Sequence, residues 1–431
     1  MSDEQWQDYL KDTRQMCKYG AKCYQKNADH LNKFKHPPQQ FKGKADKMRN
    51  NARVSPYSRN EEAKRAPPKL PTENETSSPQ SSDTNTLSAQ EAVVDVVEEK
   101  SNTSVDDNVS FPKITINDNT QYHDNGSDNK IYRECFLVDM PSDFFKFYEC
   151  LKNEPGSVEK LLASVNLQLI GPYDLLLGKL PIIDDKDLYL IHWRFFYDPP
   201  EFQAVLKKKG KSEYHIGYFR DSPDEDPVFL AVNNSEKDYA IKPIAKNIFG
   251  AVYWYLQEEK KTSPFVSIAC QKLMEKINSW AKEHDFTLEE YNIRNRQSQT
   301  VCKSFHGAGV AVPYNKKTQL GYRSLAESDA KIRKLFKKLA EAKSQSEKDS
   351  VLSEIQPVTT FASIAVDECD FGTGLEAGIA MFCSGLKELE PSALSSLCAV
   401  YPLLNRQAFS KIIQVHLKHR RKGPDMSIIS Q

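Results

Sequence analysis

The sequence predicts an α+β protein with three parts: a small N-terminal zinc finger, a disordered linker, and a folded region in which an α+β subdomain packs on a mostly helical subdomain. Two cysteines and two histidines lie close together near the N-terminus. A long aromatic-free stretch follows, after which hydrophobic clusters alternate with turn signals before helical patterns take over. We place the four segments at 12–38, 39–130, 131–265 and 266–423, because 431 residues suffice for two or three domains.

The first segment contains the stretch MCKYGAKCYQKNADHLNKFKHPP, which begins at Met16. It has too few apolar side chains for a core, and segments of this size need a metal or disulfides to fold. Its spacing, C-x5-C-x6-H-x5-H, supplies two thiolates and two imidazoles, the donor set that closes a tetrahedral structural zinc site. We therefore predict one zinc ion bound by Cys17, Cys23, His30 and His36. The alternative is a disordered N-terminus in which these residues coincide by chance.

The second segment, 39–130, is predicted to be a disordered linker. Between residues 58 and 110 there is no aromatic residue, and such a polar stretch cannot bury enough surface to offset the entropy of ordering. The apolar island AVVDVV, 92–97, is part of this solvated tether, a transient helix or a docking motif. The basic residues of 33–69 and the run KHRRK at 418–422 are typical of nuclear import signals and nucleic-acid contacts, and also of ordinary solvated surfaces.

The composition of the whole chain narrows the class of protein. Lys+Arg and Asp+Glu both number 59, so the net charge favours no particular partner. No apolar run approaches the roughly 20 residues of a membrane span, and the N-terminal residues lack the apolar region of a signal peptide. We expect an intracellular protein without a membrane partner. Nothing in the sequence indicates an obligate dimer, and we expect a monomer.

The third and fourth segments have the hydrophobic patterns of a folded domain. MPSDFFKFYECLKN predicts a helix that starts near Ser142 or Asp143. Its buried stripe is expected to consist of Phe144, Phe147, Tyr148 and Leu151. Three runs are typical of strands in a small sheet: VNLQLIGPYDLL, LYLIHWRFFYDPPEFQ and YHIGYFRDSPDEDPVFLAVN. Helical patterns are found at 268–284, 329–341, 373–383 and 393–417.

The densest polar feature is IAVDECDFGTGLE, 364–376, where Asp367, Glu368 and Asp370 lie between apolar stretches. Such a cluster serves acid/base or metal chemistry if it faces a cleft, and forms a solvated turn before a helix capped by Asp370 if it does not. The standard motifs G-x-G-x-x-G, G-x-x-x-x-G-K-[ST], H-E-x-x-H and G-x-S-x-G are missing. The glycine-rich FHGAGVAVP, 305–313, is more simply a tight turn than a phosphate loop.

A second polar feature lies upstream. The segment QLGYRSLAESD places Tyr322 and Arg323 on a turn with Gly321. Arg323 either pairs with Glu368 across the domain or is an ordinary surface arginine, and the sequence leaves both alternatives open.

The N-terminal stretch matches a known pattern, C-x-Y-G-x-x-C-Y-R followed by two histidines and H-P. The matching residues are Cys17, Tyr19, Gly20, Cys23, Tyr24, His30, His36 and Pro37. In these residues it resembles the poly(ADP-ribose)-binding zinc finger, although Gln25 stands where that family usually carries arginine. The resemblance implies that Tyr19, Tyr24 and Gln25 contact poly(ADP-ribose). Stacking of adenine on a tyrosine ring is worth about 1 to 3 kcal/mol per base.

Six further stretches match a second family: LQLIGPYDLLLGK, HWRFFYDPPEFQ, YHIGYFRDSPDEDPV, FHGAGVAVP, GYRSLAESDA and DECDFGTGLE. In these stretches the chain resembles histone PARylation factors, the accessory proteins of poly(ADP-ribose) polymerases. The resemblance implies that Glu368 is a general base that completes the polymerase's active site and directs ADP-ribose to serine. It also implies that Asp367, Tyr322 and Arg323 bind the partner. Ile364 stands where the vertebrate pattern has an aromatic residue.

The two resemblances together imply a function. A positioned carboxylate that takes the proton of a serine hydroxyl contributes roughly 10²- to 10⁴-fold to the rate. NAD is then expected to be held by the polymerase and not by this chain, which is not an enzyme alone but supplies a catalytic glutamate in trans. The expected partners are a DNA-damage-activated poly(ADP-ribose) polymerase, histones and poly(ADP-ribose), and the expected location is the nucleus, at chromatin near DNA damage.

Three alternatives predict different behaviour. A stand-alone hydrolase of ADP-ribose bonds that uses Asp367 and Glu368 would turn over without a partner. In a non-catalytic scaffold that binds poly(ADP-ribose), the substitution Glu368→Gln would leave serine modification unchanged. A nucleic-acid binder that uses the basic run 42–65 would show salt-dependent DNA binding without the finger.

Overall fold

The computed structural model describes residues 11–16, 28–36, 111–124, 128–152 and 157–430. Two compact units are present, Met1–Glu99 and Lys100–Gln431. Residues 39–110 of the predicted linker lie outside the described residues, and the segment boundaries given above stay predictions. No helix of the described part of the chain is both long and apolar enough to cross a membrane.

The first unit contains three short described elements: β1 (Gln15–Met16), α2 (Ala28–Lys33) and β2 (Phe34–Lys35). The two strands are parallel, with Gln15 opposite Phe34. Lys35 Nζ donates a 2.6 Å hydrogen bond to the carbonyl of Asp12. These contacts hold the chain after α2 against the segment that precedes the finger's first cysteine.

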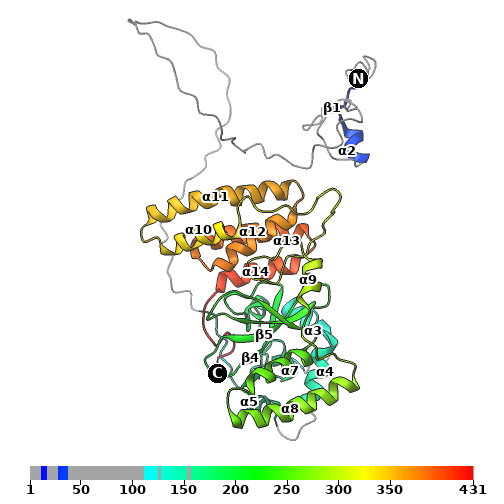
Figure 1. Ribbon diagram of the computed structural model, residues 1–431, viewed down its shortest axis with the longest axis vertical. Coiled ribbons are helices and arrows are strands. Elements are labelled where there is room, and N and C mark those ends of the chain that lie inside the picture. Colours follow the sequence, from blue (N-terminus) through cyan, green and yellow to red (C-terminus); the bar gives the residue numbers. More distant parts are fainter. Residues whose placement is uncertain (1–10, 17–27, 37–110, 125–127, 153–156, 431) are drawn as a thin grey trace. The chain divides into compact units, whose positions relative to one another are not determined.

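The second unit is an α+β domain around a five-stranded antiparallel sheet, as predicted (Figure 1). Its strands, in spatial order as well as in sequence, are β3 (Leu167–Leu169), β4 (Phe202–Lys208), β5 (Tyr214–Phe219), β6 (Phe229–Asn234) and β7 (Lys242–Ala245). β5 and β6 pair from Tyr214–Asn234 to Phe219–Phe229. Nearly every residue of the three central strands is buried, so both faces of the sheet are covered.

Helices pack at both ends of this sheet (Figure 1). Those of the first part of the unit are α3 (Asn129–Phe136), α4 (Ser142–Lys152), α5 (Val158–Ala163), α6 (Tyr173–Leu176), the 3-10 helix η3 (Lys186–Ile191), α7 (Ile248–Glu259), α8 (Pro264–Glu283) and α9 (Ile293–Gln299). α7 contacts β6, β7, α4 and α8. Asp143 of α4 joins these layers, because its carboxylate accepts hydrogen bonds from Tyr218 Oη (2.9 Å) and Ile248 N (2.7 Å).

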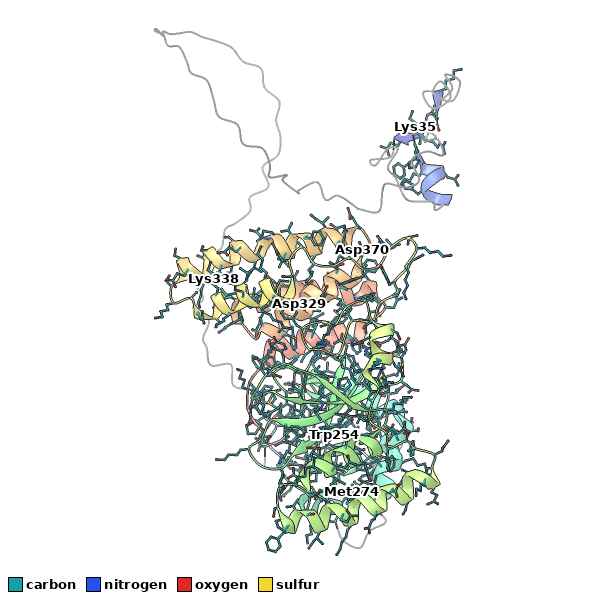
Figure 2. The ribbon with its side chains drawn as sticks, in the orientation of Figure 1. Lys35, Trp254, Met274, Asp329, Lys338 and Asp370 are labelled. Atoms are coloured by element: carbon teal, nitrogen blue, oxygen red, sulfur yellow. The ribbon has the colours of Figure 1, made fainter. Side chains whose placement is uncertain are left out.

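The second part of the unit is helical. It consists of α10 (Asp329–Glu341), α11 (Gln345–Asp367), α12 (Phe371–Ser384), the 3-10 helix η4 (Lys387–Leu389), α13 (Glu390–Leu403) and α14 (Gln407–His419). α12 is buried along nearly its whole length and packs between α11 and α13, while α14 packs on α13 and η3. In Figure 2, Asp370 lies at the end of the unit opposite to Trp254 of α7 and Met274 of α8.

Several predicted elements are confirmed and two are wrong. The α4 helix starts at Ser142, and Phe144, Phe147 and Leu151 are buried while Tyr148 is partly exposed. The run LYLIHWRFFYDPPEFQ is not a strand, since it forms η3 and turns and joins β4 only at Phe202. Buried Arg194 explains this difference, because its guanidinium donates to the carbonyls of Leu190, Pro199 and Phe202 and replaces a strand partner.

The predicted single helix at 393–417 is two helices, α13 and α14. The chain turns between them at Asn405, whose φ of 59° is left-handed, and the helix–turn–helix path lets α14 return to η3. The helix α11 was not predicted from the sequence. Its five buried positions lie among serines, threonines and Pro357, which hide the helical period.

The basic run 418–422 is only partly a surface segment: Lys418 and Lys422 are exposed, and the Arg420 side chain is buried. The Arg420 side chain is 1% exposed, and its guanidinium carbon lies 3.9 Å from the ring centroid of Phe196 and 4.2 Å from that of Phe382. It donates to the carbonyls of the same two residues, at 2.7 and 2.9 Å. Arg420 therefore ties the end of α14 to α12 and to the turn after η3.

Candidate functional site

The acidic cluster forms the turn between α11 and α12. Asp367 is the last residue of α11 and Glu368 is its C-cap, with its backbone N–H donating to Ile364 and Ala365. Cys369 has a left-handed φ of 66°, which reverses the chain. Asp370 then precedes α12 and donates its N–H to the Ala365 carbonyl at 2.8 Å. The carboxylates thus lie on a tight, backbone-bonded corner.

The segment around Gly321 packs directly on this corner. Gly321 N donates to Asp370 Oδ1 at 2.9 Å, and Gly372 N donates to the Gly321 carbonyl at 2.8 Å. Thr373 Oγ1 accepts from Arg323 N at 2.9 Å and lies 2.7 Å from its carbonyl, to which it donates. A Cβ atom on Gly372 would lie 2.7 Å from Val312 Cγ2, so only glycine permits this close approach.

Arg323 joins the two carboxylates that flank Cys369. Its Nη2 forms an ion pair with Glu368, and its Nε lies 2.9 Å from Asp370 Oδ2. Its guanidinium carbon also lies 5.5 Å from the ring centroid of Phe361 on α11. The pairing of Arg323 with Glu368, one of the two alternatives left open by the sequence, is therefore present.

Asp370 and Glu368 differ in how far their carboxylates are exposed, and this difference indicates different roles. The Asp370 side chain is 4% exposed and its oxygens face Gly321 N and Arg323, so it stabilises the corner. It stands at the N-cap position of α12 but makes no side-chain capping bond. The Glu368 side chain is 53% exposed. Glu368 is therefore positioned by Arg323 and still accessible to a second molecule.

Tyr322 turns its hydroxyl into the domain. It donates a 3.1 Å hydrogen bond to Glu376 Oε2 on α12. Burial raises the pKa of Glu376, and burial likewise raises the pKa values of Tyr322 and Cys302 beside it. The Tyr322 ring is only half-buried, so its outer part lies at the surface beside Arg323 while its hydroxyl anchors the turn.

Three residues that hold this site in place were not predicted from the sequence in that role. Asp370, Thr373 and Glu376 recur every third residue and bond to Gly321, Arg323 and Tyr322 in that order. The i, i+3 spacing of polar residues on an otherwise apolar helix was the available signal. These three residues hold the turn that carries the predicted partner-binding pair.

A groove begins beside Asp367. It has a volume of about 540 Å³ and lies between α11, α12 and α13. Hydroxyl side chains line much of it, among them Ser363 of α11 and Ser396 of α13, and Met381 of α12 also lines it. The acidic corner therefore borders a hollow surface and not a flat one.

The FHGAGVAVP segment is a turn. Gly307 and Gly309 have φ values of 84° and 82°, which favour glycine. Nε of the buried Arg296 side chain donates a 2.8 Å hydrogen bond to the Ala308 carbonyl. The segment thus presents a carbonyl to an internal arginine, which serves packing and not phosphate binding.

The finger's histidines converge. His30 Nε2 and His36 Nε2 lie 3.1 Å apart, with ring centroids 5.0 Å apart. Two imidazoles bound to one tetrahedral zinc ion have their nitrogens about 3.3 Å apart, given Zn–N bonds of about 2.0 to 2.1 Å. This pair therefore fits two ligands of such an ion. The other predicted finger residues, Cys17, Cys23, Tyr19, Tyr24 and Gln25, lie outside the described residues.

Comparisons with known proteins match both parts of the chain. The family model for histone PARylation factor 1 matches residues 127–420, and that for the PBZ domain matches residues 14–39. Histone PARylation factor 1 of Bos taurus is 39% identical over 294 residues, covering 66% of this chain and 84% of the relative. That of Danio rerio is 38% identical over 291 residues, covering 66% and 83%. A putative histone PARylation factor 1-like protein of Homo sapiens is 36% identical over 301 residues, covering 67% and 85%.

Proposed function

Because this chain belongs to the histone PARylation factor 1 family, we propose that it is an accessory factor of a DNA-damage-activated poly(ADP-ribose) polymerase. In this proposal it completes the polymerase's active site and directs ADP-ribose to serine on histones and other proteins. The observation that carries the proposal is the accessible Glu368 carboxylate, held at the surface by Arg323.

The proposed chemistry uses Glu368 as a general base. NAD is the polymerase's substrate, and its glycosidic bond to nicotinamide breaks as the serine oxygen bonds to the ribose carbon. The serine hydroxyl proton passes to a Glu368 oxygen, and nicotinamide leaves with the electrons of the broken bond. The exposed carboxylate suits this task, because a base in trans must reach a second protein's active site.

The neighbours of Glu368 suit partner binding. Asp367 lies one residue before it, at the edge of the groove between α11 and α13. Tyr322 and Arg323 lie on the turn that packs against the same corner. We propose that these three residues contact the polymerase, so that docking and delivery of the base happen at one surface. Tyrosine and arginine are both enriched at protein–protein interfaces.

The finger is proposed to bind poly(ADP-ribose) with one structural zinc ion. The match to the PBZ domain and the convergent pair His30–His36 support this assignment. Tyr19, Tyr24 and Gln25 are the proposed polymer contacts. A finger joined by a long linker raises the local concentration of the accessory domain where polymer is made, which places the protein at damaged chromatin in the nucleus.

The test is an ADP-ribosylation assay with a DNA-activated polymerase, a serine-containing histone peptide and labelled NAD. It compares no addition, wild type, Glu368→Gln and Glu354→Gln. Glu354 is a matched control, since it lies on α11, which Glu368 caps, and is likewise exposed and paired with a cation, Lys338. We expect wild type and Glu354→Gln to switch modification to serine, and Glu368→Gln to bind the polymerase without switching it. Equal activity of Glu368→Gln and wild type would instead indicate a non-catalytic scaffold.

A further inference from the structure

A second pocket lies where the segments 111–124 and 426–430 close over the sheet. The two segments are joined by hydrogen bonds from Ile114 N to the Ile428 carbonyl (2.6 Å) and from Ser430 N to the Ile114 carbonyl (3.0 Å). The pocket between them and the start of α6 has a volume of about 380 Å³. In Figure 1 the C-terminus lies level with β4, away from α11 and α12, and the pocket shares no residue with the acidic corner.

The polar end of this pocket is Asp174, a residue that is 7% exposed. Its Oδ2 accepts two hydrogen bonds, from His192 Nε2 at 2.9 Å and from Trp193 Nε1 at 3.2 Å. His192 Nδ1 in turn accepts from Ile428 N at 3.3 Å, which leaves the ring proton on Nε2. The network fixes the carboxylate in place.

The other carboxylate oxygen of Asp174, Oδ1, has no hydrogen-bond donor in the described ranges of the chain. It is a carboxylate oxygen of a largely buried residue, at the wall of a pocket that opens to the surface. An anion placed in this way is stabilised by a cation that brings its own hydrogen-bond donors.

The remaining walls suit a cation on an apolar stem. Ile116 and Ile429 supply aliphatic surface, and Tyr122 and Trp193 supply aromatic rings. The indole of Trp193 already has the ammonium of Lys207 5.5 Å from its centroid, so this ring contributes apolar surface to the pocket and its cation-binding face is paired within the chain. Lysine and arginine combine a methylene stem, which packs on apolar walls, with a charged head.

We propose that this pocket binds a lysine or arginine side chain of a basic protein segment, with the charged head at Asp174 and the stem against Ile116, Tyr122 and Ile429. The proposal adds a docking point for a basic partner or substrate at a distance from the Glu368 corner. It does not depend on the proposed catalytic role of Glu368.

One lining residue favours an anion instead. Lys179 lies at the pocket, but its ammonium is paired with Glu159 and its side chain is 47% exposed. Its charge therefore weakens the attraction of a cation without abolishing it. Removing the charge of Lys179 should therefore strengthen the binding of a cationic ligand and weaken the binding of an anionic one.

The experiment measures binding of a dye-labelled Gly-Ala peptide carrying several lysines to the full chain by fluorescence anisotropy, without polymerase or NAD. We expect Asp174→Asn to weaken binding by about tenfold or more, the scale of a charged hydrogen bond. Lys179→Gln should tighten binding, and Tyr122→Ser should weaken it. Asp184→Asn, which removes an equal charge from an exposed position, and Glu368→Gln should bind like wild type.

Two outcomes would overturn the proposal: unchanged binding by a folded Asp174→Asn variant, or weaker binding by Lys179→Gln. Should Asp174→Asn fail to fold, as judged by its circular dichroism spectrum, the exposed positions Lys179 and Tyr122 decide the matter. Loss of peptide binding in Glu368→Gln would place the basic segment at the acidic corner instead.

Discussion

Arg323 and Asp370 form an ion pair, with Nε 2.9 Å from Oδ2, that ties the turn at Gly321 to the start of α12. The same guanidinium pairs with Glu368, so one arginine both stabilises the corner and orients its exposed carboxylate. Structural and functional roles at this site are therefore coupled through a single side chain.

Removing this arginine should destabilise the domain. In Arg323→Ala, the buried Asp370 carboxylate keeps, from the described residues, only its bond from Gly321 N, and we expect a loss of about 1 to 3 kcal/mol in the free energy of unfolding. Urea denaturation measures the change. Lys337→Ala is the control, because its 3.8 Å pair with Glu341 is exposed and should contribute less than about 1 kcal/mol. Equal effects of the two variants would contradict a stabilising role for the Arg323–Asp370 pair.

Glu376 should make stability fall as pH rises. Burial raises its pKa in the folded protein above the ordinary value of 4.5, so the folded state holds this proton more tightly than the unfolded chain. The contribution is fully present below pH 4.5 and is lost as pH rises through the raised folded value. Glu376→Gln stays neutral, so its stability relative to wild type should increase with pH above 4.5.

Denaturation curves of wild type and Glu376→Gln between acidic and neutral pH check this expectation. Glu354→Gln serves as the control, because it makes the same chemical change at an exposed carboxylate instead of a buried one. A constant difference between wild type and Glu376→Gln at all pH values would show that burial of Glu376 has no such effect.

Loss of one finger histidine should remove the zinc ion and leave the second unit intact. In His36→Ala the predicted tetrahedral set has three donors, and we expect metal content to fall from one zinc per chain toward zero, with loss of poly(ADP-ribose) binding. Mass spectrometry of metal content and a polymer-binding assay measure both. The thermal transition of residues 111–430 should not change. His284→Ala, in the second unit, should keep the zinc; a normal zinc content in His36→Ala would exclude the predicted ligand set.

Arg420 should act as a packing residue. Its replacement by methionine leaves the carbonyl of Phe196 without this donor and leaves that of Phe382 with the bond from Gly385 N, and we expect a loss of about 1 to 3 kcal/mol in unfolding free energy. Lys418→Met, at an exposed position of the same run, should change the value far less. Urea denaturation measures both values. If the two variants lose the same free energy of unfolding, Arg420 does not stabilise the junction of α12 and α14.

The sequence allowed prediction of elements with a strong local period. α4, α10 and the paired strands β5 and β6 follow their apolar patterns, and the α+β class follows from them. Two kinds of element escaped. The segment 188–201 has strand-like composition, but Arg194 satisfies its carbonyls from inside the protein. α11 has a buried stripe at 351, 355, 358, 362 and 365, but two of these five positions are alanines and the residues between them include serines, threonines and Pro357, so the sequence signal was weak.

The candidate site was predictable in its residues and not in its geometry. Motif resemblance identified Asp367, Glu368, Tyr322 and Arg323 as candidates. No local pattern gives the fold of α11 back onto α12, and this corner is what brings Glu368 to Arg323. The difference in burial between Glu368 and Asp370 likewise depends on tertiary packing.

The pairing of residues 114 and 428–430 also decides how the domain responds to mechanical load. The two segments run parallel at the Ile114–Ile429 bridge. A force applied to the chain before Phe111 and after Ser430 therefore slides the two segments past each other. The two hydrogen bonds of Ile114, with Ile428 and with Ser430, then bear the force together and not one after the other. Tension transmitted through the linker while the finger is bound elsewhere would meet this shear contact before it reached the sheet.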